Sequence, residues 1–192
     1  MGGGYVGNAG VFLIQTLFGI YILAVMLRFL FQLVRADFYN PLSQVLVKVT
    51  NPPLIPLRRI IPGFRGIDIA SILLMLVLQV IELILISFLK GYSFQPVGLV
   101  VLSATELLSL VINVFFFSIL IQVIISWISP GSHNPVVSLV YSLNEPLMRP
   151  ARRLIPPISG LDLSPLVVMV GLQLCTFLVI APLRDLGSSL LT

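Results

Sequence analysis

Charged residues are scarce in this chain. Asp, Glu, Lys and Arg make up 9% of its 192 residues, whereas hydrophobic residues make up 58%. Soluble domains carry about 25% charged residues, so the composition excludes a water-facing surface over most of the protein. The net charge is +4. Because the charges cluster beside apolar runs, we expect a bilayer with anionic headgroups as the partner, and not nucleic acid.

Cysteine and histidine are almost absent, with Cys175 and His133 the single representatives. One cysteine excludes an intramolecular disulfide, and a lone cysteine and a lone histidine supply too few ligands for zinc or haem. Glycine-rich phosphate loops, Ser-His-Asp sets and carboxylate pairs at catalytic spacing are missing as well. We therefore expect no cofactor and no enzymatic activity.

Four apolar runs are long enough to cross a bilayer, which takes about 20 residues per helix. They cover residues 11–34, 69–89, 99–128 and 163–183. Lipid-exposed backbone must satisfy its own hydrogen bonds, which favours helices. The sequence predicts an all-α membrane protein with four transmembrane helices. Residues 1–10 lack the positive charge of a cleavable signal peptide, so the first run is expected to be a retained helix.

The chain matches itself without a gap when it is shifted by 94 residues. The matched residues, first copy before second, include Asn40 and Asn134, Pro52 and Pro146, Pro56 and Pro150, Arg58-Arg59 and Arg152-Arg153, Gly66 and Gly160, Asp68 and Asp162, and Gln79 and Gln173. Apolar bias does not explain matches at these residue types. We predict two repeats, residues 1–97 and 98–192, each with two transmembrane helices. Because two is an even number, both repeats enter from the same side and are parallel.

Each repeat carries a proline-rich linker between its two spans. Proline lacks a backbone donor and disfavours helix. We therefore expect short amphipathic helices over residues 42–49 and 136–143, lying in the membrane interface, each followed by a non-helical, proline-rich strap. The linkers hold eight Lys and Arg residues, against Lys90 and Arg184 at the other ends of the spans. The positive-inside rule then places the linkers in the cytoplasm and both termini on the opposite side of the membrane.

The order Asn-Pro, Pro-x-x-x-Pro-x-Arg-Arg, Ile-Pro and Gly-x-Asp occurs in both copies and resembles the signature of the YggT family. Arg35-x-Asp37 precedes it in the first copy, where the second copy has Ser129 and Gly131. The resemblance implies an integral membrane protein of bacteria or plastids. It also implies links to osmotic-stress tolerance, to cell division or nucleoid organisation, and, in plastids, to cytochrome maturation. It supplies no catalytic residues.

The arginine pairs Arg58-Arg59 and Arg152-Arg153 are candidate contacts for lipid or a partner, because guanidinium binds phosphate in a bidentate manner. The alternative is a topology signal with generic lipid contact. Asp68 and Asp162 begin the spans that follow and suit N-caps. A salt bridge from each to the nearby arginine pair is compatible with that role.

Gln79 and Gln173 lie in mid-span at matching positions. We interpret them as making a helix–helix hydrogen bond, worth about 1 kcal/mol. The alternative is a polar lining along the pseudo-symmetry axis.

Three ionisable residues, Arg28, Glu82 and Glu106, also lie within predicted spans. In one interpretation they snorkel to the membrane surfaces. In the other, Glu106 faces the bundle or a small polar cavity, and Arg28 contacts Asp68 or Asp162.

Three hypotheses on function follow. The first is a non-enzymatic scaffold, assembly or osmotic-stress factor that acts through its cytoplasmic linkers on lipid, a membrane-protein partner or a second copy. The second is a small channel or transporter subunit that affects ion homeostasis. The third, an enzyme of lipid or haem chemistry, has the least support, because no acid/base or metal-binding set is present.

Overall fold

The computed structural model describes residues 3–91, 95–129, 134–155 and 162–191. In chain order its helices are α1 (Gly3–Leu33), α2 (Pro41–Ile60), α3 (Ile69–Lys90), α4 (Pro96–Ile128), α5 (Pro135–Leu154), α6 (Ser164–Cys175), the π-helical segment η1 (Thr176–Ile180) and α7 (Ala181–Ser189). His133, Gly131 and Gly160 lie outside the described residues.

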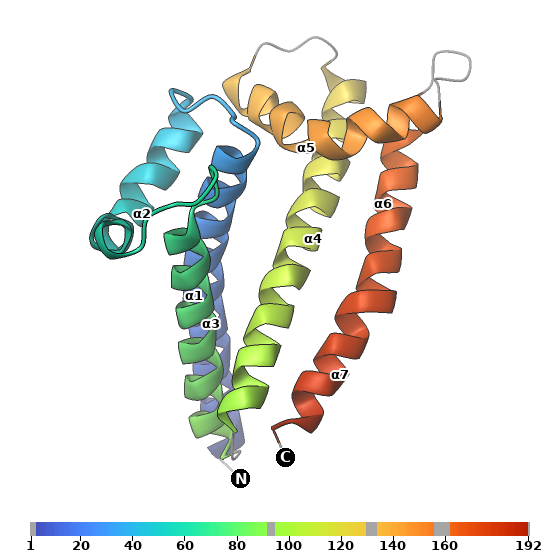
Figure 1. The fold of residues 1–192 in the computed structure, drawn as a ribbon. Helices are drawn as coiled ribbons and strands as arrows, with labels where there is room; N and C mark the ends of the chain where they lie inside the picture. Colours follow the sequence, from blue (N-terminus) through green and yellow to red (C-terminus); the bar gives the residue numbers. More distant parts are fainter. Residues whose placement is uncertain (1–2, 92–94, 130–133, 156–161, 192) are drawn as a thin grey trace.

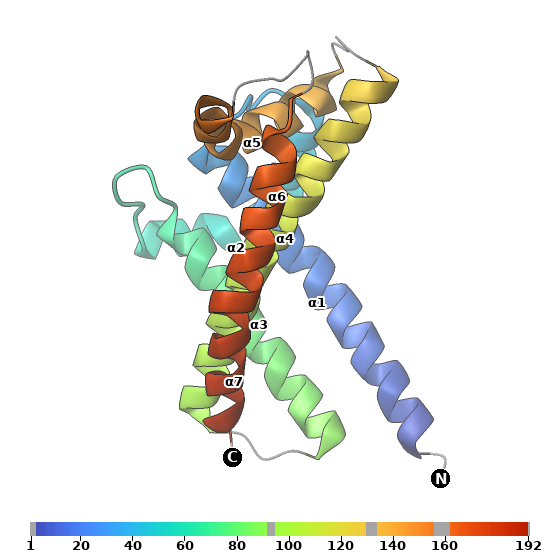
Figure 2. The same ribbon diagram turned by 90° about the vertical axis from the view of Figure 1, so that its right-hand side faces the viewer.

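Four helical stretches in the described part of the chain are long and apolar enough to cross a membrane. They are α1, α3, α4 and the continuous run of α6, η1 and α7. The predicted all-α, four-helix architecture is confirmed. Figures 1 and 2 show both chain ends at one end of the bundle and α2 and α5 together at the other. The two linkers therefore lie at the same end of the bundle, as parallel repeats require.

The proline-rich straps are helical, which corrects the expectation of short helices over residues 42–49 and 136–143. Helix α2 continues through Pro52, Pro53 and Pro56, and α5 continues through Pro146 and Pro150. A proline removes one hydrogen bond and bends a helix away from its own side. Proline on one outward face therefore bends these helices without ending them.

The spacing of the prolines explains why this is tolerated. Pro52 and Pro56, like Pro146 and Pro150, are four residues apart and exposed, so each pair shares one outer face. Carbonyls that lose their partners on such a face are open to water and headgroups. The opposite face is packed, with Leu54 completely buried in α2. Pro53 points less outward, and the Val49 carbonyl that it leaves without a partner accepts a hydrogen bond from the Tyr21 hydroxyl at 3.4 Å.

Both linker helices begin in the same way. The side chains of Asn40 and Asn134 accept hydrogen bonds from the backbone N–H of Leu42 and Val136, two residues on, and a proline occupies the first turn of each helix. This is the arrangement that asparagine caps and N-terminal prolines favour. The Asn40 side chain also donates to the Pro135 carbonyl at 2.6 Å, so the first cap binds the start of the second linker helix.

The apolar core lies where α1, α3 and α4 meet below the linker helices. Buried α1 residues dominate it, among them Ile22, Val25 and Met26, and Leu46 of α2 and Leu139 of α5 cover its upper end. The linker helices therefore close one end of the bundle with their apolar faces. Four of their six basic residues remain exposed.

Helices α4 and α7 approach closely at the end that carries the termini (Figure 2). A Cβ on Gly98 would lie 2.8 Å from the Leu190 backbone, and one on Gly187 would lie 2.7 Å from the Leu102 side chain. The final span reaches this contact through the π-helical segment η1, immediately before Pro182. Proline and π-turns are common sources of helix distortion.

Replacing Gly98 by alanine is expected to lower the free energy of unfolding by about 1–3 kcal/mol, the usual range for overpacking. Gly19→Ala is the control, because a Cβ there meets no atom within 4 Å. Alanine also has the higher helix propensity, so the control should be neutral or slightly stabilising. Thermal unfolding of both variants in detergent checks this. Equal stability of the two variants would contradict the close α4–α7 contact.

Candidate functional site

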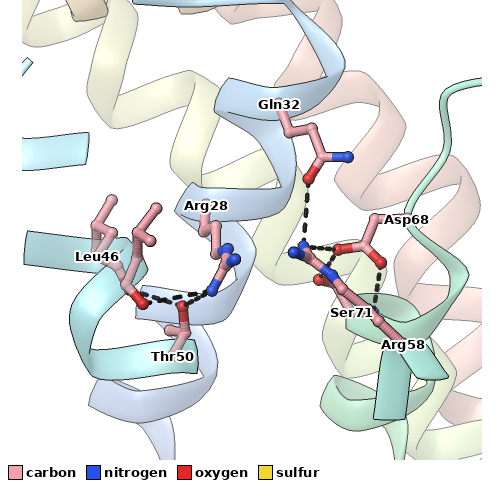
Figure 3. A network of polar contacts seen from close by, with 8 residues as sticks. Arg28, Gln32, Leu46, Thr50, Arg58, Asp68 and Ser71 are labelled. Carbon is pink, nitrogen blue, oxygen red and sulfur yellow. Dashed lines mark hydrogen bonds and ion pairs between the residues drawn. The ribbon is translucent and has the colours of Figure 1, made fainter. Parts of the chain in front are cut away.

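A polar network joins the last turn of α2 to the first turn of α3 (Figure 3). Arg58 forms an ion pair with Asp68 and donates to the Gln32 side chain of α1 at 3.4 Å. Asp68 is the N-cap of α3 and accepts from the backbone N–H and the hydroxyl of Ser71. The two interpretations of Asp68 therefore hold together, because one carboxylate caps the helix and binds the arginine.

The electrostatics of Asp68 follow from these partners. Burial alone would raise the pKa of this carboxyl. The hydrogen bonds from Arg58 and Ser71 and the positive charge of Arg58 outweigh burial, so the pKa lies below its ordinary value. Asp68 is thus held as a carboxylate, and it offsets one of the positive charges at this end of the bundle.

The second repeat builds the same ion pair with more exposed groups. Its helix α6 begins one residue later than α3 does in the first repeat, with Leu163 as the N-cap, so the prediction of Asp162 as an N-cap is wrong. Arg152 donates to Asp162 at 3.1 Å, and Asp162 accepts from the backbone N–H of Ser164 at 2.9 Å. Glu145 lies 3.4 Å from the same arginine. Burial raises the pKa of Asp162, but the hydrogen bonds from Ser164 and Arg152 and the charge of Arg152 lower it to a net value below the ordinary one.

The arginine pairs do not act as units. In each pair the first arginine, Arg58 or Arg152, turns toward the protein and binds the aspartate at the start of the next span. The second, Arg59 or Arg153, is exposed and has no ion pair with the described residues. The exposed members therefore stay candidates for lipid or partner binding, whereas the inward members have a structural partner.

Arg28 occupies a position that neither sequence-based interpretation anticipated. Its side chain is buried, at 8% exposure, and it donates to the Thr50 hydroxyl at 2.6 Å and to the Val47 carbonyl at 3.4 Å (Figure 3). It does not snorkel to the surface, and no ion pair with Asp68 or Asp162 forms among the described residues. Arg28 instead joins α1 to the middle of the linker helix.

The second repeat has a neutral version of this contact. Shifting the chain by 94 residues places Gln122 on Arg28 and Asn144 on Thr50, and the Asn144 amide donates to the Gln122 side chain at 2.7 Å. Both residues of this pair are buried. The sequence analysis missed this contact because it compared only identical residues between the two copies. The signal would have been two positions that are polar in both copies but occupied by different residues.

Among the described residues, Gln79 and Gln173, the polar residues in mid-span, do not form the helix–helix hydrogen bond that was predicted for them. Gln79 donates to Glu82, three residues on in the same helix, at 3.0 Å, and both are buried. Its predicted helix–helix bond is therefore a bond within α3. Gln173, the matching residue, is exposed on α6, so the match in sequence does not extend to the environment.

Glu106 has a cationic partner on another span. Arg184 of α7 donates to both carboxylate oxygens of Glu106 in α4, at 2.9 and 3.0 Å. Bidentate pairs of this kind are among the stronger ion pairs. The two charges neutralise each other, and the pair fixes α7 on α4 near the glycine contact. Because Arg184 supplies a counter-charge, Glu106 does not have to snorkel to the membrane surface.

The linker end is rich in hydrogen-bond donors. Its described side chains offer guanidinium, amide and hydroxyl donors beside two aspartates that already have partners. Within the described part of the chain, no group of three or more His, Cys, Asp and Glu residues could hold a metal ion. Donor-rich surfaces of this kind suit phosphate or carboxylate groups.

Comparison with known proteins identifies the family. A sequence model of the CCB3/YggT family matches two tandem segments, residues 7–89 and 101–183, whose starts and ends are both 94 positions apart. An uncharacterized protein of Pseudomonas aeruginosa is 49% identical over 90% of this chain and 89% of its own. The uncharacterized protein YggT of Escherichia coli K12 is 37% identical over 96% of both chains. The chain therefore belongs to the CCB3/YggT family, which confirms the resemblance. No solved structure matches it.

Asp68→Asn is expected to lower the free energy of unfolding at pH 7 by about 2 kcal/mol, the size typical of a hydrogen bond to a charged group. Asparagine keeps the cap, so the loss reports the ion pair with Arg58. Asp162→Asn, in the exposed pair, should cost less than about 1 kcal/mol. Unfolding in detergent measures both variants.

The pH dependence gives a second check on Asp68. Its pKa is depressed in the folded state, so the stabilisation is complete above the unfolded value of about 3.9. It disappears as the pH falls through the lower folded value. The difference between wild type and Asp68→Asn should therefore shrink below about pH 4. A difference that is the same at pH 3 and pH 7 would rule out a charged Asp68–Arg58 contact.

Proposed function

We propose that this member of the CCB3/YggT family is a non-enzymatic scaffold or assembly factor that acts at one membrane surface. The observation that carries the proposal is the common position of α2 and α5, which lie together at the end of the bundle opposite both termini (Figure 1). Through these helices the protein binds anionic lipid headgroups and a membrane-protein partner or second copy. A role in osmotic-stress tolerance is part of the proposal.

The distribution of charge supports a cytoplasmic location for this surface in a bacterial inner membrane. The connections that include α2 and α5 carry eight Lys and Arg residues, and the opposite ends of the spans carry two. Such a bias is typical of cytoplasmic loops. Anionic lipids of the cytoplasmic leaflet attract basic segments of this kind.

The exposed charges on this surface are available for a ligand. Lys48 of α2, Arg59 at its end and Arg153 of α5 are exposed and form no ion pair with the described residues. Exposed cations add little to fold stability. Their presence on both linker helices therefore supports a role in binding.

The polar residues of the spans give less support to a channel. Gln79 contacts Glu82, Glu106 contacts Arg184, and Gln122 contacts Asn144, as described above. Each of these pairs directs polar atoms of its two residues to contacts within the protein, which leaves fewer polar atoms to line an aqueous path. A channel is therefore the second candidate function, and the ion-flux experiment below tests for it.

Reversing the exposed charges, in Arg59→Glu/Arg153→Glu, should abolish function while the protein still inserts in its native orientation. The readout is growth after osmotic upshift of a host that lacks its own family member and carries the variant. Lys90→Glu, a reversal at the opposite end of the bundle, is the control and should complement fully. Cysteine labelling from either side checks orientation. Full complementation by the double variant contradicts the proposal.

Ion flux separates the scaffold from a channel. Purified protein reconstituted in liposomes under an osmotic gradient should give no flux above that of empty liposomes, because Glu82, Glu106 and Gln122 each have a partner within the protein. A fluorescent ion indicator inside the liposomes measures the flux. Robust, selective flux would overturn the scaffold proposal.

A further inference from the structure

A cavity of about 430 Å³ lies between the upper end of α1 and the inner side of α2 in the first repeat. It is lined by Arg28, Arg35 and Arg58, and by apolar side chains that include Phe31, Leu46 and Val47. Ligand pockets in proteins have volumes of about 300–1,000 Å³. The cavity is therefore large enough for a small ligand, and three cations line it.

Its positive charge is not balanced by the described residues. Arg28 is almost fully buried, and its partners among the described residues are a hydroxyl and a carbonyl, both bound through one terminal nitrogen. Arg35 forms no ion pair with the described part of the chain, and Arg58 is paired with Asp68. Asp37, the other nearby acid, accepts from the Tyr39 backbone and does not line the cavity. A buried charge is costly unless a counter-charge accompanies it.

The second repeat shows that the fold does not require these charges. Gln122 replaces Arg28 in the equivalent buried contact, and Ser129 stands at the position of Arg35. The cavity beside Gln122 in the second repeat, of about 700 Å³, is lined by Arg152 and also by its counter-charge Asp162. The neutral pair of Gln122 and Asn144 thus joins α4 to α5, just as Arg28 and Thr50 join α1 to α2. The additional cations of the first repeat call for a separate explanation.

We propose that the first-repeat cavity binds the phosphate group of an anionic phospholipid, with Arg28 and Arg35 as the principal donors. Guanidinium groups match phosphate oxygens in geometry and charge. Arg28 lies five residues before the end of α1, or about 8 Å along the helix axis, which suits a phosphate at the linker end of the bundle. The apolar side chains of the wall suit the glycerol and first acyl carbons of a lipid. This inference rests on the proposed lipid-binding surface and assigns to it one saturable site.

The first experiment removes the two unpaired charges in Arg28→Gln/Arg35→Asn. Glutamine copies the second repeat, and asparagine tolerates the left-handed backbone of Arg35, whose φ is 55°. The matched control is Arg65→Asn/Lys90→Gln, which also removes two exposed charges and includes an arginine with φ 50°. Titration of detergent-solubilised protein with phosphatidylglycerol, followed by native mass spectrometry, counts the bound lipids.

Wild type and the control are expected to saturate at one tightly bound lipid, and the test variant should bind it at least tenfold more weakly. If the double variant does not fold, Arg35→Asn alone keeps the test valid, because this position is exposed and outside any helix. It should bind phosphatidylglycerol several-fold more weakly than Arg65→Asn does. Unchanged single-lipid binding in both cavity variants would overturn the proposal.

The second experiment distinguishes lipid from free phosphate. Diacylglycerol, which lacks the phosphate, should not be retained, whereas phosphatidylglycerol should. Inorganic phosphate and glycerol phosphate should displace the lipid only at concentrations far above that of the lipid itself. Retention of diacylglycerol as strong as that of phosphatidylglycerol refutes the phosphate assignment. Equal affinity for inorganic phosphate refutes the lipid.

The two proposals fail in different ways. If the cavity variants bind lipid normally and Arg59→Glu/Arg153→Glu loses complementation, the cavity site is wrong and the basic surface stands. If the cavity variants lose the single lipid and charge reversal leaves complementation intact, the cavity site stands and the proposed function is wrong.

Discussion

The ion pair between the end of each linker helix and the start of the next span is the contact on which this arrangement depends. Arg58 binds Asp68 in the first repeat and Arg152 binds Asp162 in the second. Each aspartate also accepts a hydrogen bond from one backbone N–H in the first turn of the following span, a group that has no partner within the helix. One side chain therefore sets both where the span begins and where the linker helix ends. With its end fixed, a bent, proline-containing helix is held against the bundle in a single position.

The remaining contacts of the linker helices follow from that constraint. Asn40 caps α2 and also reaches the first carbonyl of α5, so the two linker helices meet at their starts. In mid-helix, α2 is joined to α1 through Thr50, and α5 is joined to α4 through Asn144. Start, middle and end of α2 are therefore all fixed by polar contacts, while Leu46 and Leu54 pack inward. The outer face is left to prolines and exposed cations.

Much of this could be predicted from the sequence, and the reasons for the failures are physical. Hydropathy gave the four spans, the 94-residue shift gave the repeat, and the position of Asp68 gave its cap and its ion pair. The helicity of α2 beyond Pro52 was not predicted, because the destabilisation by proline depends on which face it occupies. Glu106–Arg184 was not predicted either, since pairing between spans depends on helix rotation. Gln79 and Gln173 match in sequence but differ in burial, because α6 packs less fully than α3.

The difference between the two copies is more informative than their similarity. Residues shared by both copies, such as the asparagine caps and the Arg–Asp pairs, build the common scaffold. A difference that keeps the same contact but changes its charge, as between Arg28–Thr50 and Gln122–Asn144, shows that the charge is not needed for that contact. Burying a guanidinium where a carboxamide suffices costs desolvation free energy. The proposed phosphate in the adjoining cavity would supply the counter-charge, which is why the first repeat, and not the second, carries the argument for a phosphate ligand.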